Sequence, residues 1–320
     1  MLFQVVLRIW ENWRGGKTGS GNLFSLFLKV FSFSVKRHAC SHPYRGMKNL
    51  FFRSKYDPLN NFLFYKIFGE EGDEIQLLGF INAVLGKTRD NKFVSVEILE
   101  NKSFMAEIMG GKSCILDVRA KMPNGAMVNV EVQLRDKQNM DRRSLFYLSK
   151  EYVRELDEGG DYIKLPDVIA INIVNYDFPQ TRNFHSSFHL REDTEHEIIL
   201  TNALEIHFIN MVKYRKQGKG KLDNPLCRWL AWFDKGSPPK LLEEVVKMDA
   251  AIQTAEERFA HIIRDKDELL AYDRYVLAQC DRTAELNFAL KKGRTEVLEL
   301  LDQGLSIEEI KQRLRQTESS

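Results

Sequence analysis

Two acidic residues, Asp117 and Glu131, stand in the middle of apolar runs that otherwise have the composition of β-strands. Strand centres normally carry β-branched or aromatic residues, so a carboxylate in each run is unexpected. The turn residues Pro123, Asn124 and Gly125 lie between the runs and allow them to pair as an antiparallel hairpin. Neighbouring carboxylates repel each other unless a cation lies between them, and hard divalent cations such as Mg²⁺ prefer oxygen ligands. The pattern therefore predicts a metal site on a hairpin.

The loop length decides whether the two acids meet. A three-residue loop at 123–125 pairs Met122 with Ala126 and places Asp117 opposite Glu131, with Cβ atoms roughly 5 Å apart. A two-residue loop would turn the two carboxylates to opposite faces of the sheet. The metal-site hypothesis therefore predicts the longer loop or a bulge. The alternative interpretation is that both acids are ordinary outward-facing polar residues of a half-exposed sheet.

The flanking segments predict the elements that would hold the hairpin. The spacing of apolar residues and the positions of capping and turn residues predict the order of the elements. They are a helix over 73–85 ended by Gly86, a strand over 93–99, the two hairpin strands, a helix over 141–156 and a strand over 166–174. The last strand is almost continuously apolar, which is typical of a strand buried on both faces. The order predicts an α/β (α+β) protein with an αβββαβ core and a mixed sheet.

This ordered set resembles the PD-(D/E)XK nuclease superfamily, and more narrowly the Rpn family of recombination-promoting nucleases and putative transposases. The resemblance spans roughly residues 50 to 315, and no single motif in it is specific. The matching stretches are Phe64–Gly69, Leu77–Asn82, Leu116–Val118, Val130–Gln133, Arg143–Tyr147 and Gly160–Pro166.

The resemblance implies a Mg²⁺-dependent (or Mn²⁺-dependent) DNA endonuclease, a hydrolase of phosphodiester bonds linked to recombination or mobile elements. Asp117 and Glu131 would bind the metal, with the Val132 carbonyl as a further ligand. Most of the superfamily carries Lys two positions after this Glu, where this chain has Gln133. Glutamine can hydrogen-bond a water but supplies no charge, so the resemblance implies slower chemistry.

A further acidic ligand usually comes from the first helix of such a fold. Glu70, Glu71, Asp73 and Glu74 all lie near the predicted helix start and any of the four could supply this ligand, with Glu71 taken as the candidate. The alternative is that these acids only favour the positive end of the helix dipole.

Three arginines are candidates for contacts with DNA. Arg119 follows Asp117 by two positions and should share its face of the sheet. Arg142 and Arg143 open the helix after the Glu131 strand and could touch phosphates, which set the register of a protein on DNA. The alternative for all three is a solvated surface.

The N-terminal part of the chain is basic, and the remainder is net acidic. Residues 1–46 carry seven Lys or Arg and one acid, a net charge of +6, whereas the remainder has 40 basic and 44 acidic residues, a net charge of −4. A net-negative body excludes a uniformly basic DNA binder, so contact with DNA requires a local basic patch. The family-like sequence starts near Met47. We expect residues 1–46 to be a disordered extension or translated upstream sequence.

Cysteine spacing and hydropathy indicate a cytoplasmic protein without a membrane segment. The four cysteines (40, 114, 227 and 280) form no Cys-x-x-Cys pair and predict free thiols in a reducing compartment. The apolar run 23–35 contains Lys29 and is too short to span a membrane. His185 and His189 lie four residues apart, in a stretch that resembles a loop and lacks convergent metal ligands.

The C-terminal part is predicted to be helical. Apolar spacing predicts helices over 195–213 and within 241–292, separated by a Gly/Lys loop at 217–221 that is either a connector or a DNA-touching loop. The expected domains are a nuclease-like domain at 47–180 and a helical region at 181–320, through which a homodimer could form.

Two function classes follow. The first is the metal-dependent endonuclease, supported by Asp117, Glu131 and Gln133 standing in a coherent order of elements. The alternative is a catalytically degenerate DNA-binding or interaction protein that retains the nuclease fold, favoured by the acidic body and by the missing lysine.

Overall fold

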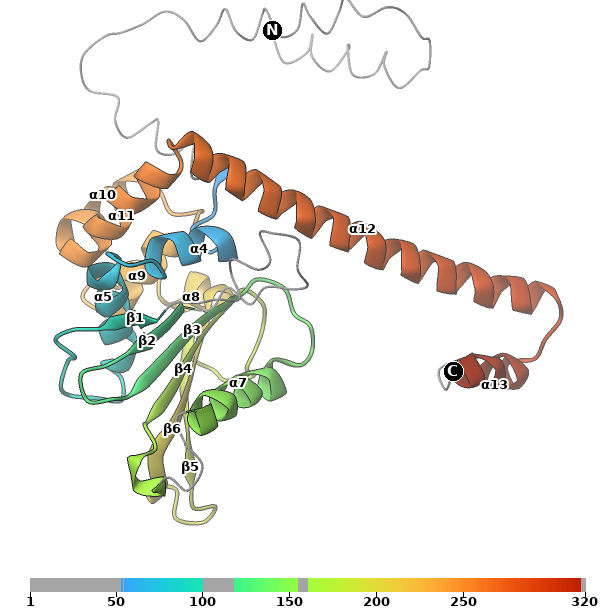
Figure 1. Cartoon of the computed structure of the whole chain (residues 1–320), viewed down its shortest axis with the longest axis horizontal. Helices are drawn as coiled ribbons and strands as arrows, with labels where there is room; N and C mark the ends of the chain where they lie inside the picture. Colours follow the sequence, from blue (N-terminus) through green and yellow to red (C-terminus); the bar gives the residue numbers. More distant parts are fainter. Residues whose placement is uncertain (1–52, 54, 100–117, 155–160, 318–320) are drawn as a thin grey trace, which may run out of the picture. The chain divides into compact units, whose positions relative to one another are not determined.

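A mixed sheet with the strand order β1-β2-β3-β4-β6-β5 organises the fold. The structure is a computed structural model that describes residues 53, 55–99, 118–154 and 161–317 (Figure 1). The predicted core is confirmed: α5 (Glu74–Leu85), β1 (Glu97–Leu99), β2 (Val118–Lys121), β3 (Met127–Gln133), α7 (Met140–Arg154) and β4 (Val168–Val174) follow in the expected order.

The hairpin has the three-residue loop that the metal-site hypothesis requires. The Met122 N–H donates to the Ala126 carbonyl at 2.8 Å, and Val118 pairs with Val130 across β2 and β3. Gly125 has φ of 86°, a left-handed conformation that glycine adopts without steric cost. The predicted register is therefore confirmed for the described part of the hairpin, whereas Asp117 lies outside the described residues.

Strands β3, β4 and β6 run parallel, with α7 crossing over between β3 and β4. Every residue of β4 is buried, as its continuous apolar sequence predicts. Because the parallel strands all end at one edge of the sheet, Gln133, Val174 and Asn210 mark that edge.

The prediction of a helix over 195–213 is wrong for most of its length. Residues Ile199–Asn210 form β6, and His185–Arg191, expected to be a loop, form the edge strand β5. In β6 the side chains of Ile206 and Phe208 pack with the small cluster around Met140, while Ile209 joins the main core. The apolar residues of this segment also fit a helical spacing. Pairing with β4 on one side and β5 on the other stabilises the strand instead.

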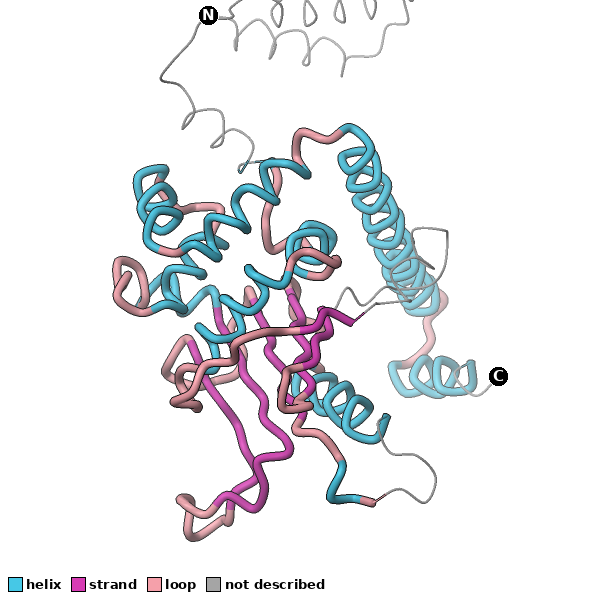
Figure 2. The backbone as a smooth tube through the Cα atoms, turned by 60° about the vertical axis from the view of Figure 1, so that its left-hand side comes forward, coloured by secondary structure: helices cyan, strands magenta, loops and turns pink. Residues whose placement is uncertain are grey.

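Helices cover the two faces of the sheet unequally (Figure 2). The helices α4 (Asn61–Phe68), α5 and α9 (Pro225–Phe233) bury the main core, which contains Phe68, Phe80, Trp229 and Trp232. The helix α7 covers the other face with a smaller cluster around Leu148. Among the described residues, α7 is the helix that separates that second face from solvent.

The helical C-terminal region is confirmed and begins after β6. It consists of α8 (Met211–Gln217), α9, α10 (Pro239–Met248), α11 (Ala250–Ile262), α12 (Lys266–Asp302) and α13 (Ile307–Thr317). A short 3₁₀ turn, η1 (Tyr162–Lys164), precedes β4. Within the described ranges, no helix combines the length and the apolar character needed to cross a membrane.

Candidate active site

A polar stripe runs along β3 on the face that α7 covers. Asn129, Glu131 and Gln133 alternate with Val128, Val130 and Val132, because successive side chains of a strand point to opposite faces. The valines join the main core, so the polar residues point towards α7. Glu131 is only 2% exposed. A carboxylate so deeply buried requires compensating partners.

Glu131 receives those partners from its own strand and from α7. Its Oε1 atom accepts hydrogen bonds from Arg143 Nε at 2.7 Å, Arg143 Nη2 at 2.5 Å and Gln133 Nε2 at 2.5 Å. Such charge-assisted bonds are stronger than neutral ones and fix the orientation of the carboxylate. Among the described residues no hydrogen bond reaches Oε2.

Asn61 is a site residue that sequence reasoning missed. Its Nδ2 atom donates to the Val132 carbonyl at 3.1 Å, so the first residue of α4 lies beside the strand that carries Glu131. The neighbouring Asn60 caps α4, with its side chain accepting hydrogen bonds from the Phe62 and Leu63 N–H groups. The sequence signal at these asparagines was a helix cap, and no spacing rule connects position 61 with position 132.

The candidate DNA-binding arginines lie in different environments. Arg143 contacts Glu131, and its guanidinium lies 5.1 Å from the centre of the Tyr147 ring. Arg119 pairs with Glu151 of α7 at 2.7 Å. Arg142 is exposed on α7. The structure thus brings Arg143 to the polar stripe, ties Arg119 to the same helix and leaves Arg142 facing solvent.

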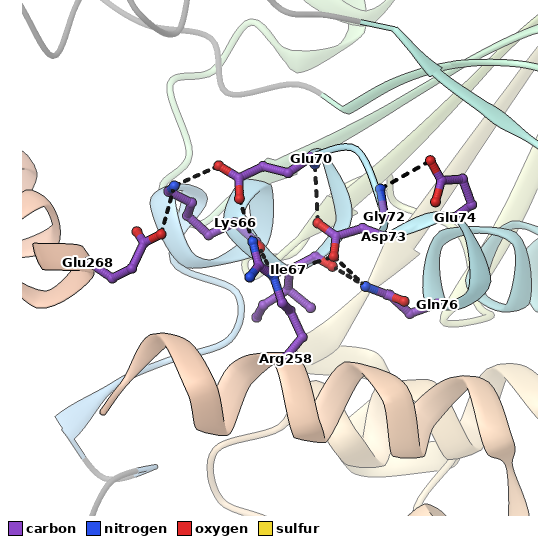
Figure 3. A network of polar contacts seen from close by, with 9 residues as sticks. All are labelled: Lys66, Ile67, Glu70, Gly72, Asp73, Glu74, Gln76, Arg258 and Glu268. Atoms are coloured by element: carbon purple, nitrogen blue, oxygen red, sulfur yellow. Dashed lines mark hydrogen bonds and ion pairs between the residues drawn. The ribbon is translucent and has the colours of Figure 1, made fainter. Parts of the chain in front are cut away.

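The acids near the start of α5 belong to a different network (Figure 3). Glu70 and Asp73 pair with Arg258 of α11, while Lys66 bridges Glu70 and Glu268 of α12. Burial raises the pKa of Asp73 to about 7. These contacts connect α4 and α5 with the C-terminal helices.

Glu71 is exposed in the turn between α4 and α5. That turn follows the C-terminus of α4, whose eight residues span about 12 Å from Asn61. Within the described part of the chain, no contact joins Glu71 or its acidic neighbours to Glu131.

The groups around Glu131 suit a hard cation. Glu131 Oε2, the Val132 carbonyl and Asn129 Oδ1 are oxygen atoms, and Asn129 Oδ1 is buried with no hydrogen-bond partner within the described ranges. Oxygen donors of this kind are what Mg²⁺ and Mn²⁺ prefer. No cluster of three His, Cys, Asp or Glu side chains is present among the described residues, which do not include Asp117. The residues present fit the ion as part of a ligand set.

The αβββαβ core and the buried Glu-x-Gln strand are consistent with a nuclease-like fold of the restriction-endonuclease type. A family model described as PD-(D/E)XK nuclease family transposase matches residues 58–289, so the chain belongs to that family. Searches of curated proteins and of solved structures found no match. Membership supports a nuclease-like function related to mobile elements.

Proposed function

We propose that this protein is a Mg²⁺-dependent (or Mn²⁺-dependent) DNA endonuclease that hydrolyses phosphodiester bonds in recombination or in the movement of a mobile element. The observation that carries the proposal is Glu131, buried in the family domain and oriented by Arg143 and Gln133. A carboxylate held in this way, with one oxygen unbonded among the described residues, is oriented to bind a metal through that oxygen.

Each residue has a distinct role in this proposal. Asp117 and Glu131 would hold the metal together with the Val132 carbonyl, and Glu71 stays the candidate for a further ligand although no described contact joins it to Glu131. The metal, when bound, supplies Lewis-acid stabilisation of the phosphate and lowers the pKa of a water. Gln133 would hydrogen-bond a water at the site through its side-chain amide, and Arg143 holds the Glu131 carboxylate in place. Arg119 and Arg142 are proposed to contact the DNA backbone.

The alternative function is a catalytically degenerate DNA-binding protein with the same fold. Gln133 supplies no positive charge, and its amide already donates to Glu131. Arg143 likewise compensates Glu131 without a metal. These two contacts favour the alternative because they satisfy a buried carboxylate in a protein that has lost its cation.

We further propose a cytoplasmic homodimer that forms through the C-terminal helices of the 181–320 region. Free Cys227 and Cys280 agree with a reducing compartment. On α12, Leu286 and Leu290 are each 62% exposed, and a Cβ atom on Gly293 would meet nothing within 4 Å.

The spacing on α12 supports a second copy as the partner. Leu286, Leu290, Gly293 and Val297 follow one face of α12 at helical spacing. In an antiparallel pair, Leu290 of each copy would face Gly293 of the other while Leu286 faces Val297. This self-complementary pattern is what an isologous contact requires.

Plasmid nicking tests the endonuclease proposal directly. We expect the full chain to nick supercoiled DNA with Mg²⁺, and both Asp117→Ala and Glu131→Ala to lower the rate about 100-fold, equivalent to about 2.7 kcal/mol of transition-state stabilisation. Glu195→Ala, which removes an exposed carboxylate, is the matched control.

The outcomes separate the two functions. Nicking that survives both substitutions would come from a contaminant and would remove the proposal. Absence of nicking in a folded wild-type protein that still binds DNA would establish the alternative.

A further inference from the structure

The most basic described segment of this acidic body is 211–221. It carries five Lys or Arg residues and no acid, whereas residues 47–320 as a whole have a net charge of −4. The five are Lys213, Arg215, Lys216, Lys219 and Lys221. The segment comprises α8 and the loop that leads to α9.

The segment starts at the edge of the sheet where the candidate site lies. The helix α8 follows β6 directly, and β6 ends at the same edge as β3 with its Gln133. In Figure 1, α8 is drawn at the end of the sheet that faces α4 and α9. Open sheets with parallel strands bind ligands at the carboxyl ends of those strands.

Two hydrogen bonds connect the segment to the candidate site. The Asn175 N–H donates to the Gln133 carbonyl at 3.1 Å, and Arg215 Nη1 donates to Asn175 Oδ1 at 2.7 Å. Arg215 Nε also pairs with the buried Asp234 at 3.0 Å. A single residue therefore separates Arg215 from Gln133, and Arg215 anchors α8 at this position.

The four lysines of the segment differ in whether groups of the protein already engage their ammonium groups. Lys213 of α8 donates to the Pro179 and Thr181 carbonyls and pairs with Asp177, so its charge is engaged by the loop between β4 and β5. Lys219 lies 3.6 Å from Asp234 but has a side chain that is 47% exposed. Lys216 and Lys221 are exposed, and no ion pair engages either of them within the described ranges. We call Lys216, Lys219 and Lys221 the basic rim.

We propose that the basic rim binds the phosphate backbone of the nucleic-acid substrate next to the cleavage site, an inference that rests on the endonuclease function. Lysine ammonium groups bind phosphates as point charges, independently of sequence. The rim would supply the electrostatic attraction for phosphates that the acidic body lacks. It would also hold the nucleic-acid strand near the sheet edge that carries Gln133. Continuity with that edge favours a nucleic acid over other polyanions.

Binding measured without divalent metal tests the rim independently of cleavage. The variant Lys216→Gln/Lys219→Gln/Lys221→Gln would be compared with Lys291→Gln/Lys292→Gln/Arg294→Gln, which removes three exposed charges from α12. The probe is a fluorescent 20-base-pair duplex, followed by anisotropy at several salt concentrations. We expect the rim variant to bind at least about tenfold more weakly and to lose about two to three units of salt slope. We expect the α12 variant to bind like the wild type.

Three outcomes would contradict the proposal that the basic rim binds DNA. They are a rim variant that binds like the wild type, equal losses in both triple variants, and a wild-type protein that does not bind the duplex. A loss of binding to phosphatidylserine vesicles with DNA binding intact would assign the rim to a membrane surface instead. A failure of the nuclease proposal shows as absent nicking by the wild type with rim-dependent binding preserved. Thermal unfolding of each variant checks that the fold is intact.

Discussion

Glu131 combines deep burial with three hydrogen bonds to one of its oxygens. Arg143 and Gln133 both donate hydrogen bonds to Oε1. These contacts also fix the direction in which Oε2 points. A carboxylate oriented in this way loses little conformational entropy when it binds an ion. At the scale of single residues, the role of Gln133 distinguishes a slow endonuclease from a catalytically degenerate DNA-binding protein.

Replacement of Gln133 tests whether its amide takes part in the chemistry. We expect Gln133→Ala to lower the nicking rate about tenfold, or about 1.4 kcal/mol in activation free energy, because the attacking water loses an orienting hydrogen bond. We expect Gln133→Lys to nick at least as fast as the wild type, since lysine supplies both the hydrogen bond and a charge. Single-turnover nicking rates measure both effects. Equal rates for wild type and Gln133→Ala would show that the amide only supports Glu131.

At the scale of elements, a polar cluster fastens the edge strand β5 and the end of α5 to β6. Buried Glu205 accepts hydrogen bonds from Thr88 at 2.5 Å and Arg89 at 2.9 Å. The His207 Nε2 atom lies 2.7 Å from Glu205 Oε1, and His207 Nδ1 lies 2.9 Å from His185 Nε2. The cluster replaces apolar packing at a position where three elements meet.

Acid should weaken this cluster. Burial alone would raise the pKa of Glu205, but hydrogen bonds from His207 and Thr88 and nearby positive charge lower it from 4.5 to about 2. A depressed carboxyl pKa stabilises the fold above pH 4.5, and this contribution, up to about 3 kcal/mol, is lost as the pH falls towards 2. Urea unfolding across this window should therefore show a steep loss of stability in the wild type.

The substitution Glu205→Gln should flatten that pH dependence, since it removes the titrating group while keeping its shape. Exposed Glu195→Gln is the control and should retain the wild-type slope. An unchanged slope in Glu205→Gln would assign the acid sensitivity to other groups. Burial lowers the pKa of His185 to about 3, so protonation of the unfolded chain already destabilises the fold below pH 6.5.

At the scale of the whole molecule, the long helix α12 has little intramolecular support within the described ranges. None of its 37 residues is buried. Its first turns touch the core through Tyr272, which packs edge-on against Tyr56 and Phe62. Further along, Leu286, Leu290 and Leu298 are more than half exposed. A long helix with an uncovered apolar face is typical of an association surface.

A charge placed on this face should prevent association. We expect Leu290→Lys to convert the proposed dimer to a monomer, because an antiparallel pair would bury the new ammonium beside Gly293 of the partner. Sedimentation velocity measures the change. Leu277→Lys, an equally exposed leucine on the opposite side of α12, should remain dimeric. A monomeric wild type, or equal effects of the two substitutions, would reject this interface.

The amino-acid sequence by itself determined the elements whose signals are local. The turn residues 123–125 and period-2 alternation specified the hairpin, whereas the structure decided between the two loop lengths that the sequence allowed. A continuous apolar run specified the buried β4, and the order of elements specified the nuclease-like core. These features were predictable because each depends on interactions between residues near in sequence, or on simple burial.

Only the tertiary structure decided which distant groups meet. The strand β6 has apolar spacing compatible with a helix, and parallel pairing with β4 selected the strand. The Asn61 contact with Val132, and the capture of Glu70 and Asp73 by Arg258, join residues far apart in the chain. No sequence period encodes such contacts, because they arise when packed elements bring side chains together and burial then requires every polar group to find a partner.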